Sequence, residues 1–206
     1  MDAAWEAVAI AGWAVLVLNL LVTLRLVRWL RSYHEADQLG HRREEIAELS
    51  IGEPAPSFQT RDLNGEIVRS ADLPAREMAF VFVSPHCAMC RRELPELVAL
   101  AALASKSADA EIVLVSSSGA GETQSWLASI EQDAKVNVPL RVLAARMSTS
   151  EFQITYNPRG LTPYFCHVDK NGIVTARGGL HTPAWAGIVR KWNPAAAPAR
   201  NLQRYR

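Results

Sequence analysis

Residues 78–95 read MAFVFVSPHCAMCRRELP, and this stretch decides the fold. Its start, Met78 to Ser84, is a short and nearly continuous apolar run, which predicts a strand buried on both faces. From Cys87 to about Ala104 the sequence is compatible with a helix. Two cysteines separated by two residues therefore fall at the first turn of a helix that follows a buried strand. Such a pair can close and reopen a disulfide, so the stretch predicts redox chemistry rather than structural cross-linking.

The two cysteines are expected to have different roles. Free backbone N–H groups and the helix dipole favour a thiolate at the helix start, so Cys87 is predicted to be the attacking sulfur. Cys90 lies a turn deeper, where it can resolve a mixed disulfide by attacking Cys87. His86 could stabilise the thiolate or carry a proton, and it could equally be an ordinary exposed loop histidine.

Two further residues of this helix are informative. Glu93 follows Cys90 by three residues, so it could exchange protons with the buried sulfur or simply face the neighbouring arginines on the surface. Pro95 is predicted to lie inside the helix, where it removes a backbone hydrogen bond and favours a kink.

A zinc site is the competing interpretation of the cysteine pair, and it would need two more ligands. Cys166 and His167 are the candidates, but neighbours on a strand point to opposite faces of a sheet. We therefore predict no metal and no cofactor, with Cys166 as a small buried apolar residue.

The remaining sequence from residue 51 alternates strands and helices, which predicts a mixed α/β sheet flanked by helices. A tight hairpin is expected at Asn171-Gly172, between two of the strands. The other expected strands are 111–116, 138–142, 164–168 and 173–177, and the other expected helices are 123–133, 148–154 and 183–192.

Composition limits the function classes. The 206 residues carry 22 Lys and Arg against 21 Asp and Glu, so there is no basic surplus, and we expect no nucleic-acid partner. Three cysteines are too few for a disulfide-stapled scaffold.

The N-terminal region predicts a membrane anchor. Eighteen uncharged and mostly apolar residues run from Ala7 to Leu24, and the acidic residues before them do not fit a cleaved signal peptide. The expected organisation is an anchor with its flanks at 1–30, a charged juxtamembrane segment at 31–50, a globular domain at 51–192 and a disordered tail at 193–206.

Three motifs resemble the membrane-anchored, thioredoxin-like thiol-disulfide oxidoreductases of the TlpA/ResA type. These motifs are SPHCAMCRRELP at 84–95, LTPYF at 161–165 and GEPAPSF at 52–58. The resemblance covers roughly residues 51–192, and within it the segments 84–85 and 179–183 look most like the MauD group of methylamine-utilisation proteins.

The resemblance implies a thioredoxin-like fold with a cis Thr162-Pro163 peptide beside Cys87, whose backbone is offered to a client. Glu93 would correspond to the acidic residue of reductase-like members, although no proline or aromatic residue separates the cysteines as in the common patterns. Implied partners are client proteins with cysteines or disulfides and a membrane or soluble thiol electron partner. A role in maturation of an exported redox protein would follow.

Two features of the sequence indicate opposite membrane orientations for the globular domain. The arginines that follow the apolar segment would keep the domain in the cytoplasm by the positive-inside rule. The resemblance implies a single-pass cell-membrane protein with an extracytoplasmic catalytic domain, and we adopt this expectation because thiol exchange on exported proteins explains the anchor.

Two other functions are compatible with the same fold. A peroxiredoxin-like thiol peroxidase shares the cysteine position, but Phe80 stands where such enzymes have a proline. A non-catalytic module could bind a client or deliver copper beside Pro163.

Overall fold

The computed structural model describes residues 48–135 and 137–193, together with short pieces of the N-terminal segment at 12–13, 16–20, 22–23 and 25. The chain divides into two compact units, 1–46 and 47–206. Most of the predicted anchor, juxtamembrane segment and tail lies outside the described residues. Among those that are described, no helix is both long enough and apolar enough to cross a bilayer.

One mixed sheet of seven strands organises the domain, with the strand order β2-β1-β5-β4-β3-β6-β7. Strands β3, β4 and β5 are parallel to one another, and the flanking pairs are antiparallel. The strands are β1 Gln59–Asp62, β2 Ile67–Arg69, β3 Glu77–Val83, β4 Ala110–Ser116, β5 Arg141–Ala144, β6 Tyr164–Val168 and β7 Val174–Gly179. The helices are α2 Ala88–Ser107, α3 Ala120–Ala134, α4 Glu151–Tyr156 and α5 Pro183–Trp192, with a 3-10 turn η1 at Ser70–Asp72. The predicted α/β fold with a mixed central sheet is confirmed.

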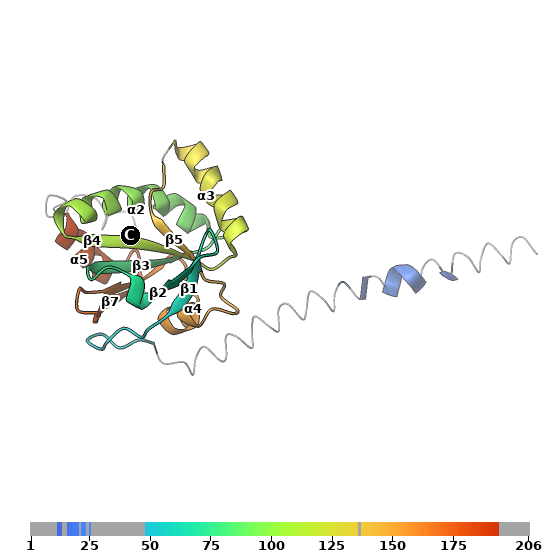
Figure 1. Cartoon of the computed structure of the whole chain (residues 1–206). Coiled ribbons are helices and arrows are strands. Elements are labelled where there is room, and N and C mark those ends of the chain that lie inside the picture. Colours follow the sequence, from blue (N-terminus) through green and yellow to red (C-terminus); the bar gives the residue numbers. More distant parts are fainter. Residues whose placement is uncertain are drawn as a thin grey trace, which may run out of the picture. The chain divides into compact units, whose positions relative to one another are not determined.

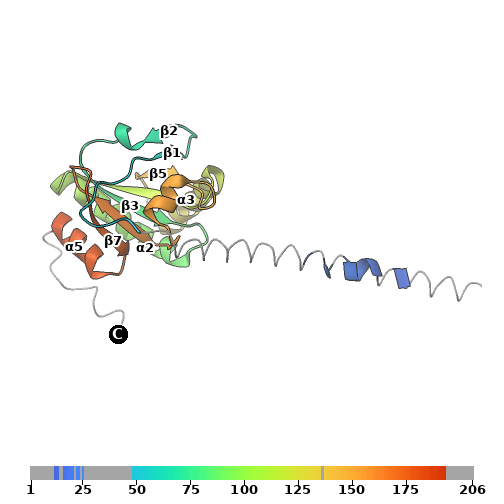
Figure 2. The same ribbon diagram turned by 90° about the horizontal axis from the view of Figure 1, so that it is seen from below.

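The apolar run of β3 feeds two cores, because successive side chains on a strand point to opposite faces. Ala79, Val81 and Val83 pack with residues of α2, α3 and α5. Phe80 and Phe82 pack on the other face, where α4 contributes an aromatic cluster. Figure 1 shows α2 and α4 on opposite sides of the sheet, and Figure 2 shows the same domain from below. Burial on both faces explains why the strand is apolar from Met78 to Val83, after Glu77 at its amino end.

Several predicted elements match closely. Strand β6 and helix α5 have the predicted bounds, and the β6–β7 hairpin turns through Asn171-Gly172 as expected. Helix α2 continues through Pro95 to Ser107.

Other boundaries differ from the prediction. The strand expected at 138–142 is β5, Arg141–Ala144, because Pro139 cannot donate to a strand ladder and the pairing with β4 starts at Arg141. The helix expected at 148–154 is α4, which starts later because Ser150 caps it by accepting the N–H of Gln153.

The β1–β2 hairpin was not predicted. Both strands are short, and the signal sits in the turn, where Asp62 accepts the N–H groups of Asn64 and Glu66 at 2.8 and 2.9 Å. Gly65 has φ +86° there, a conformation that favours glycine.

Residues 48–50 belong to the domain, although we predicted them in the juxtamembrane segment. Leu49 packs against the aromatic core. Glu48 forms ion pairs with Arg177 on β7 and with Arg159, whose Nε lies 2.7 Å from the carboxylate.

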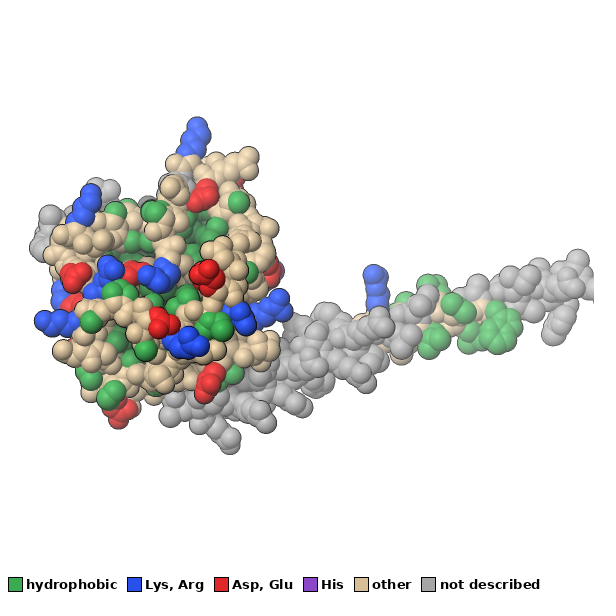
Figure 3. Space-filling model, in the orientation of Figure 1, with side chains coloured by type: hydrophobic (Ala, Val, Ile, Leu, Met, Phe, Trp, Pro, Cys, Tyr) green, Lys and Arg blue, Asp and Glu red, His purple; other side chains and the backbone are tan. Residues whose placement is uncertain are grey.

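The surface of the domain carries charges of both signs. On the face seen in Figure 3, Lys and Arg side chains alternate with Asp and Glu. This mixture accords with a formal net charge of +1 for the chain.

Candidate active site

Cys87 sits where the buried strand β3 gives way to helix α2. Its N–H donates to Ser84 O at 3.0 Å, which closes the turn after the strand. Cys87 is the N-cap of α2, with an extended backbone, and its Sγ accepts the N–H of Cys90 at 3.1 Å. A backbone N–H of the first helical turn therefore points at that sulfur. The partly exposed sulfur is therefore placed as an attacking thiolate requires.

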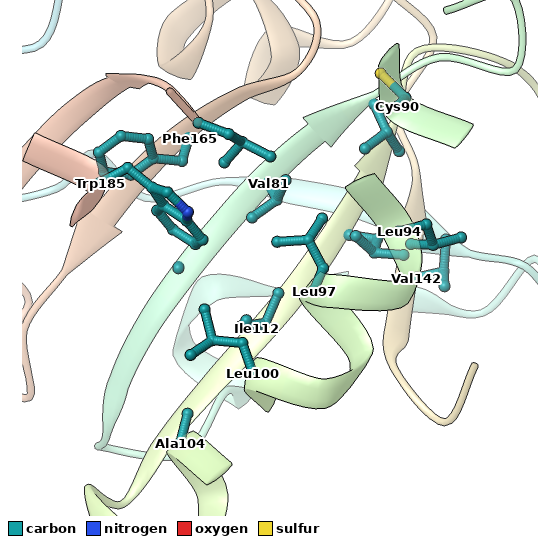
Figure 4. Close-up of a cluster of buried hydrophobic side chains, with 14 of the residues drawn as sticks. Val81, Cys90, Leu94, Leu97, Leu100, Ala104, Ile112, Val142, Phe165 and Trp185 are labelled. Atoms are coloured by element: carbon teal, nitrogen blue, oxygen red, sulfur yellow. The ribbon is translucent and has the colours of Figure 1, made fainter. Parts of the chain in front are cut away.

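Cys90 is the buried member of the pair, with 1% of its surface exposed. It continues the row of Leu94, Leu97 and Leu100 that α2 turns toward the sheet (Figure 4). Burial, followed by the contact with Cys87, raises the pKa of the Cys90 thiol to about 12. Cys90 thus holds its proton at neutral pH until an exchange reaction removes it.

The loop before β6 forms the other side of the site. The Thr162-Pro163 peptide is cis, as the resemblance implied. The Cys87 thiol donates to Thr162 O over 3.5 Å, although the two residues are 75 positions apart. The structure therefore brings the predicted client-binding loop against the predicted nucleophile.

Asn157 supports this loop and was missed in the sequence. It is fully buried, its Nδ2 donates to Leu161 O at 2.8 Å, and its Oδ1 accepts the N–H of Leu161 at 3.0 Å. An asparagine four residues before Leu161 is the available signal, because Asn side chains commonly hydrogen-bond to nearby backbone groups.

Glu93 is largely covered, with 15% of its side chain exposed. Its Oε1 lies 3.5 Å from Arg92 Nε, so the surface interpretation holds in part. The same oxygen lies 3.6 Å from Nε2 of His181, which comes from the turn between β7 and α5. Sequence reasoning gave His181 no role at the site, because it is distant from the cysteines along the chain.

His86 lies at the rim of the site. Its side chain is 78% exposed, and its Nε2 lies 2.8 Å from Glu122 Oε1 at the start of α3. The contact that the structure gives the His86 imidazole is therefore with Glu122 of α3 and not with the Cys87 sulfur.

Cys166 and His167 face opposite sides of β6, as predicted. Cys166 is buried in the aromatic core, and burial raises the pKa of its thiol to about 12. His167 lies on the other face beside Trp192. In the described part of the chain, no three His, Cys, Asp or Glu residues are grouped so that they could hold a metal ion.

A mixed sheet, a Cys-x-x-Cys pair at a helix N-terminus and an adjoining cis-proline loop define the class of thioredoxin-like redox proteins. Residues 51–177 match the AhpC/TSA family, and the chain belongs to it.

The chain is also similar to methylamine utilization proteins. The methylamine utilization protein MauD of Methylobacillus flagellatus is 26% identical over 134 residues, which cover 64% of this chain and 58% of that protein. The chain thus spans less than two thirds of that relative's length.

Solved structures show the same fold at low identity. A thiol-disulfide oxidoreductase from Bacteroides fragilis superposes with a TM-score of 0.54 at 19% identity, covering 68% of this chain and 98% of that one. A yeast mitochondrial 1-Cys peroxiredoxin gives 0.57 at 16% identity, covering 69% and 74%. At these identities the two structures share the fold of this domain.

Proposed function

We propose that this protein is a membrane-tethered thiol-disulfide oxidoreductase that exchanges disulfides with client proteins. One observation carries the proposal. The partly exposed Cys87 sulfur lies between the N–H of Cys90 and the carbonyl of Thr162, with the Cys90 thiol buried behind it. This arrangement offers one sulfur to a client and keeps the other for the second step.

In the reducing direction, the Cys87 thiolate attacks a client disulfide, and one client sulfur leaves as a thiolate. Cys90 then loses its proton and attacks Cys87, which forms the Cys87–Cys90 disulfide and releases the second client sulfur. Two electrons pass from the pair to the client. A thiol electron partner restores the dithiol, and the oxidising direction is the reverse of these steps.

Backbone groups beside Cys87 support a protein client rather than a small thiol. Extended client backbone could align with the loop at Thr162-Pro163, whose peptide is already placed against the sulfur. We propose that the clients include an exported redox protein that requires disulfide exchange for maturation.

The first experiment is equilibration of the full chain in graded glutathione or dithiothreitol buffers, with the Cys87–Cys90 state read by thiol trapping. A potential near roughly −270 mV identifies a reductase, and one toward roughly −120 mV identifies an oxidant. The proposal fails if the pair has no reversible couple.

Membrane attachment and orientation are a second part of the proposal. They are supported by the apolar run from Ala7 to Leu24 and by the purpose an anchor serves for chemistry on exported clients. A membrane-impermeant maleimide applied to intact cells should label Cys87, with Cys87→Ser as the control. Labelling only after lysis would place the domain in the cytoplasm, as the arginine count indicates.

A thiol peroxidase is the second candidate, because the fold is shared with a peroxiredoxin. Peroxide consumption in the presence of a thiol reductant distinguishes the two functions. We expect a rate near background, because Phe80 is buried at the position where such enzymes use a proline.

Replacing both Cys87 and Cys90 with serine distinguishes the proposed oxidoreductase from a non-catalytic binding module. Client maturation should stop in that variant. Retained maturation would favour binding alone.

A further inference from the structure

The exchange requires a group that accepts the proton of Cys90 when this thiol attacks. Cys90 is buried among apolar residues, and the contribution of Cys87 to its raised pKa disappears once Cys87 is bound to a client. Burial, the largest cause, persists in the mixed disulfide. A base must therefore accept the proton as Cys90 attacks.

Glu93 is the carboxylate in position to do so. Residues three apart on a helix are neighbours, with Cβ atoms about 5–6 Å apart, so Glu93 lies beside Cys90 on α2. Glu96 is the next carboxylate on the helix, but it is exposed and lies on another face. Strand β3 offers no alternative beside the cysteines, because its one titratable side chain, Glu77, lies at the opposite, amino end.

His181 reaches Glu93 from a turn with fixed geometry. Thr182 caps α5 by accepting the N–H of Trp185, and its hydroxyl donates to Gly179 O at 2.8 Å. A Cβ at Gly179 would lie 4.0 Å from Pro163 O, so this turn also packs against the cis-proline loop. His181 thus comes from a segment that touches both halves of the site.

The contact between His181 and Glu93 is an ion pair only when the imidazole is protonated. His181 Nε2 lies 3.6 Å from Glu93 Oε1, which is the distance of an ion pair rather than of a direct hydrogen bond. The His181 side chain is 35% exposed, whereas that of Glu93 is 15% exposed. Arg92 lies 3.5 Å from the same oxygen but cannot exchange a proton at working pH. His181 is therefore the titratable link between a covered carboxylate and solvent.

We propose that His181 is a positioning residue for thiol-disulfide exchange, which holds Glu93 beside Cys90 and relays the proton of Cys90 to solvent. The inference rests on the proposed function. As the Cys90 sulfur attacks Cys87, its proton passes to Glu93, the Cys87–client bond breaks, and the client leaves as a thiolate. Glu93 then returns the proton to solvent through one bridging water and His181, because 3.6 Å is too long for direct transfer. Charge and electrons therefore balance without another reactant.

A two-phase reaction with dithionitrobenzoate tests this relay in the full chain, kept in mild detergent. The reduced protein releases one coloured thiolate when Cys87 attacks and a second when Cys90 resolves the adduct. His181→Ala should slow the second phase roughly tenfold, and Glu93→Gln roughly a hundredfold, without changing the first. The pH dependence of the second phase should change in both variants.

Two comparisons separate a relay from a structural effect. Added imidazole should restore much of the second phase to His181→Ala but not to Glu93→Gln. The double variant should be no slower than Glu93→Gln alone, because both changes interrupt one path. Arg92→Ala is the matched control, since it removes a non-titrating partner of the same oxygen, and it should change the second phase less than about twofold.

The outcomes distinguish this inference from the function beneath it. If the parent protein releases only one thiolate, the pair does not close, and the proposed function fails together with the relay. If the parent shows both phases but His181→Ala is unchanged, or slows both phases equally, only the relay is overturned.

Discussion

The two ends of strand β3 each hold a buried titratable group on the same face of the sheet. At the carboxyl end, the Cys90 thiol lies behind the partly exposed Cys87. At the amino end, His167 pairs its Nδ1 with Thr175 and lies against Trp192, with 1% of its surface exposed. Both groups are buried, but only Cys90 has a reactive neighbour at the surface.

The amino end is closed by a network around Glu77. Lys191 donates to one oxygen of Glu77, and Trp192 Nε1 donates to the other at 3.1 Å. Burial alone would raise the pKa of Glu77, but these donors and the Lys191 charge outweigh it and lower the pKa. Burial, the largest cause, lowers the pKa of His167. At the amino end, the network of Glu77, Lys191 and Trp192 covers His167, and burial there serves stability. At the carboxyl end, the buried Cys90 lies behind the partly exposed Cys87, and burial there serves the chemistry.

The largest effect on disulfide exchange should come from the carboxyl end of β3, where Cys87 is partly exposed. Cys87→Ser should lower disulfide exchange with a model peptide by at least about 10³-fold, because the attacking sulfur is lost. Cys166→Ala is the matched control, since that thiol is buried on the other face, and its rate should equal that of the parent. Comparable losses in both variants, measured by product thiol release, would contradict the assignment.

The closed end should instead control folding. Trp192→Ala should lower the free energy of unfolding by about 3–5 kcal/mol, because a fully buried indole leaves a cavity. Trp192→Phe keeps most of the packing but removes the donor to Glu77, so about 1–2 kcal/mol is expected. Urea denaturation measures both values. If the folded Trp192 variants showed a changed reactivity of Cys87, the two ends of β3 would not be independent.

Acid should act on the closed end through His167. Because its folded pKa lies below its ordinary value of 6.5, the unfolded chain binds the proton more readily. Stability should therefore fall as pH drops below about 6.5, by at most about 1.4 kcal/mol per pH unit. Below 4.5, protonation of Glu77 should add to the loss.

The control for this pH dependence is His167→Gln, which removes the titrating group. Denaturation curves collected across this range should be flatter for the variant between pH 6.5 and 5. Identical slopes in the parent and in His167→Gln would show that another group causes the pH dependence. Lys191 and Asp169 are the candidates, because both interact electrostatically with His167.

The smallest effect should come from His86. Its imidazole is exposed and pairs with Glu122, so His86→Ala should change the first phase with dithionitrobenzoate by about threefold or less. Glu122→Gln should behave alike. A much larger loss in His86→Ala alone would assign His86 the direct role in stabilising the thiolate.

Local sequence patterns predicted the elements that carry the cysteines. The apolar run before Ser84 gave β3, and the Asn171-Gly172 turn gave the β6–β7 hairpin, because both signals are contained in a few adjacent residues. The β1–β2 hairpin was missed, since its short strands bury little and depend on pairing with β5.

The sequence by itself determined the reactive pair: Cys87 and Cys90 lie one helical turn apart wherever that helix forms after its strand. Only the tertiary structure decided which groups surround them. Thr162 reaches Cys87 and His181 reaches Glu93 because β6 and β7 pair beside β3 and return distant segments to its carboxyl end. The physical reason is that helical and strand periodicity depend on neighbouring residues, whereas these contacts depend on how separate segments bury their apolar faces on one sheet.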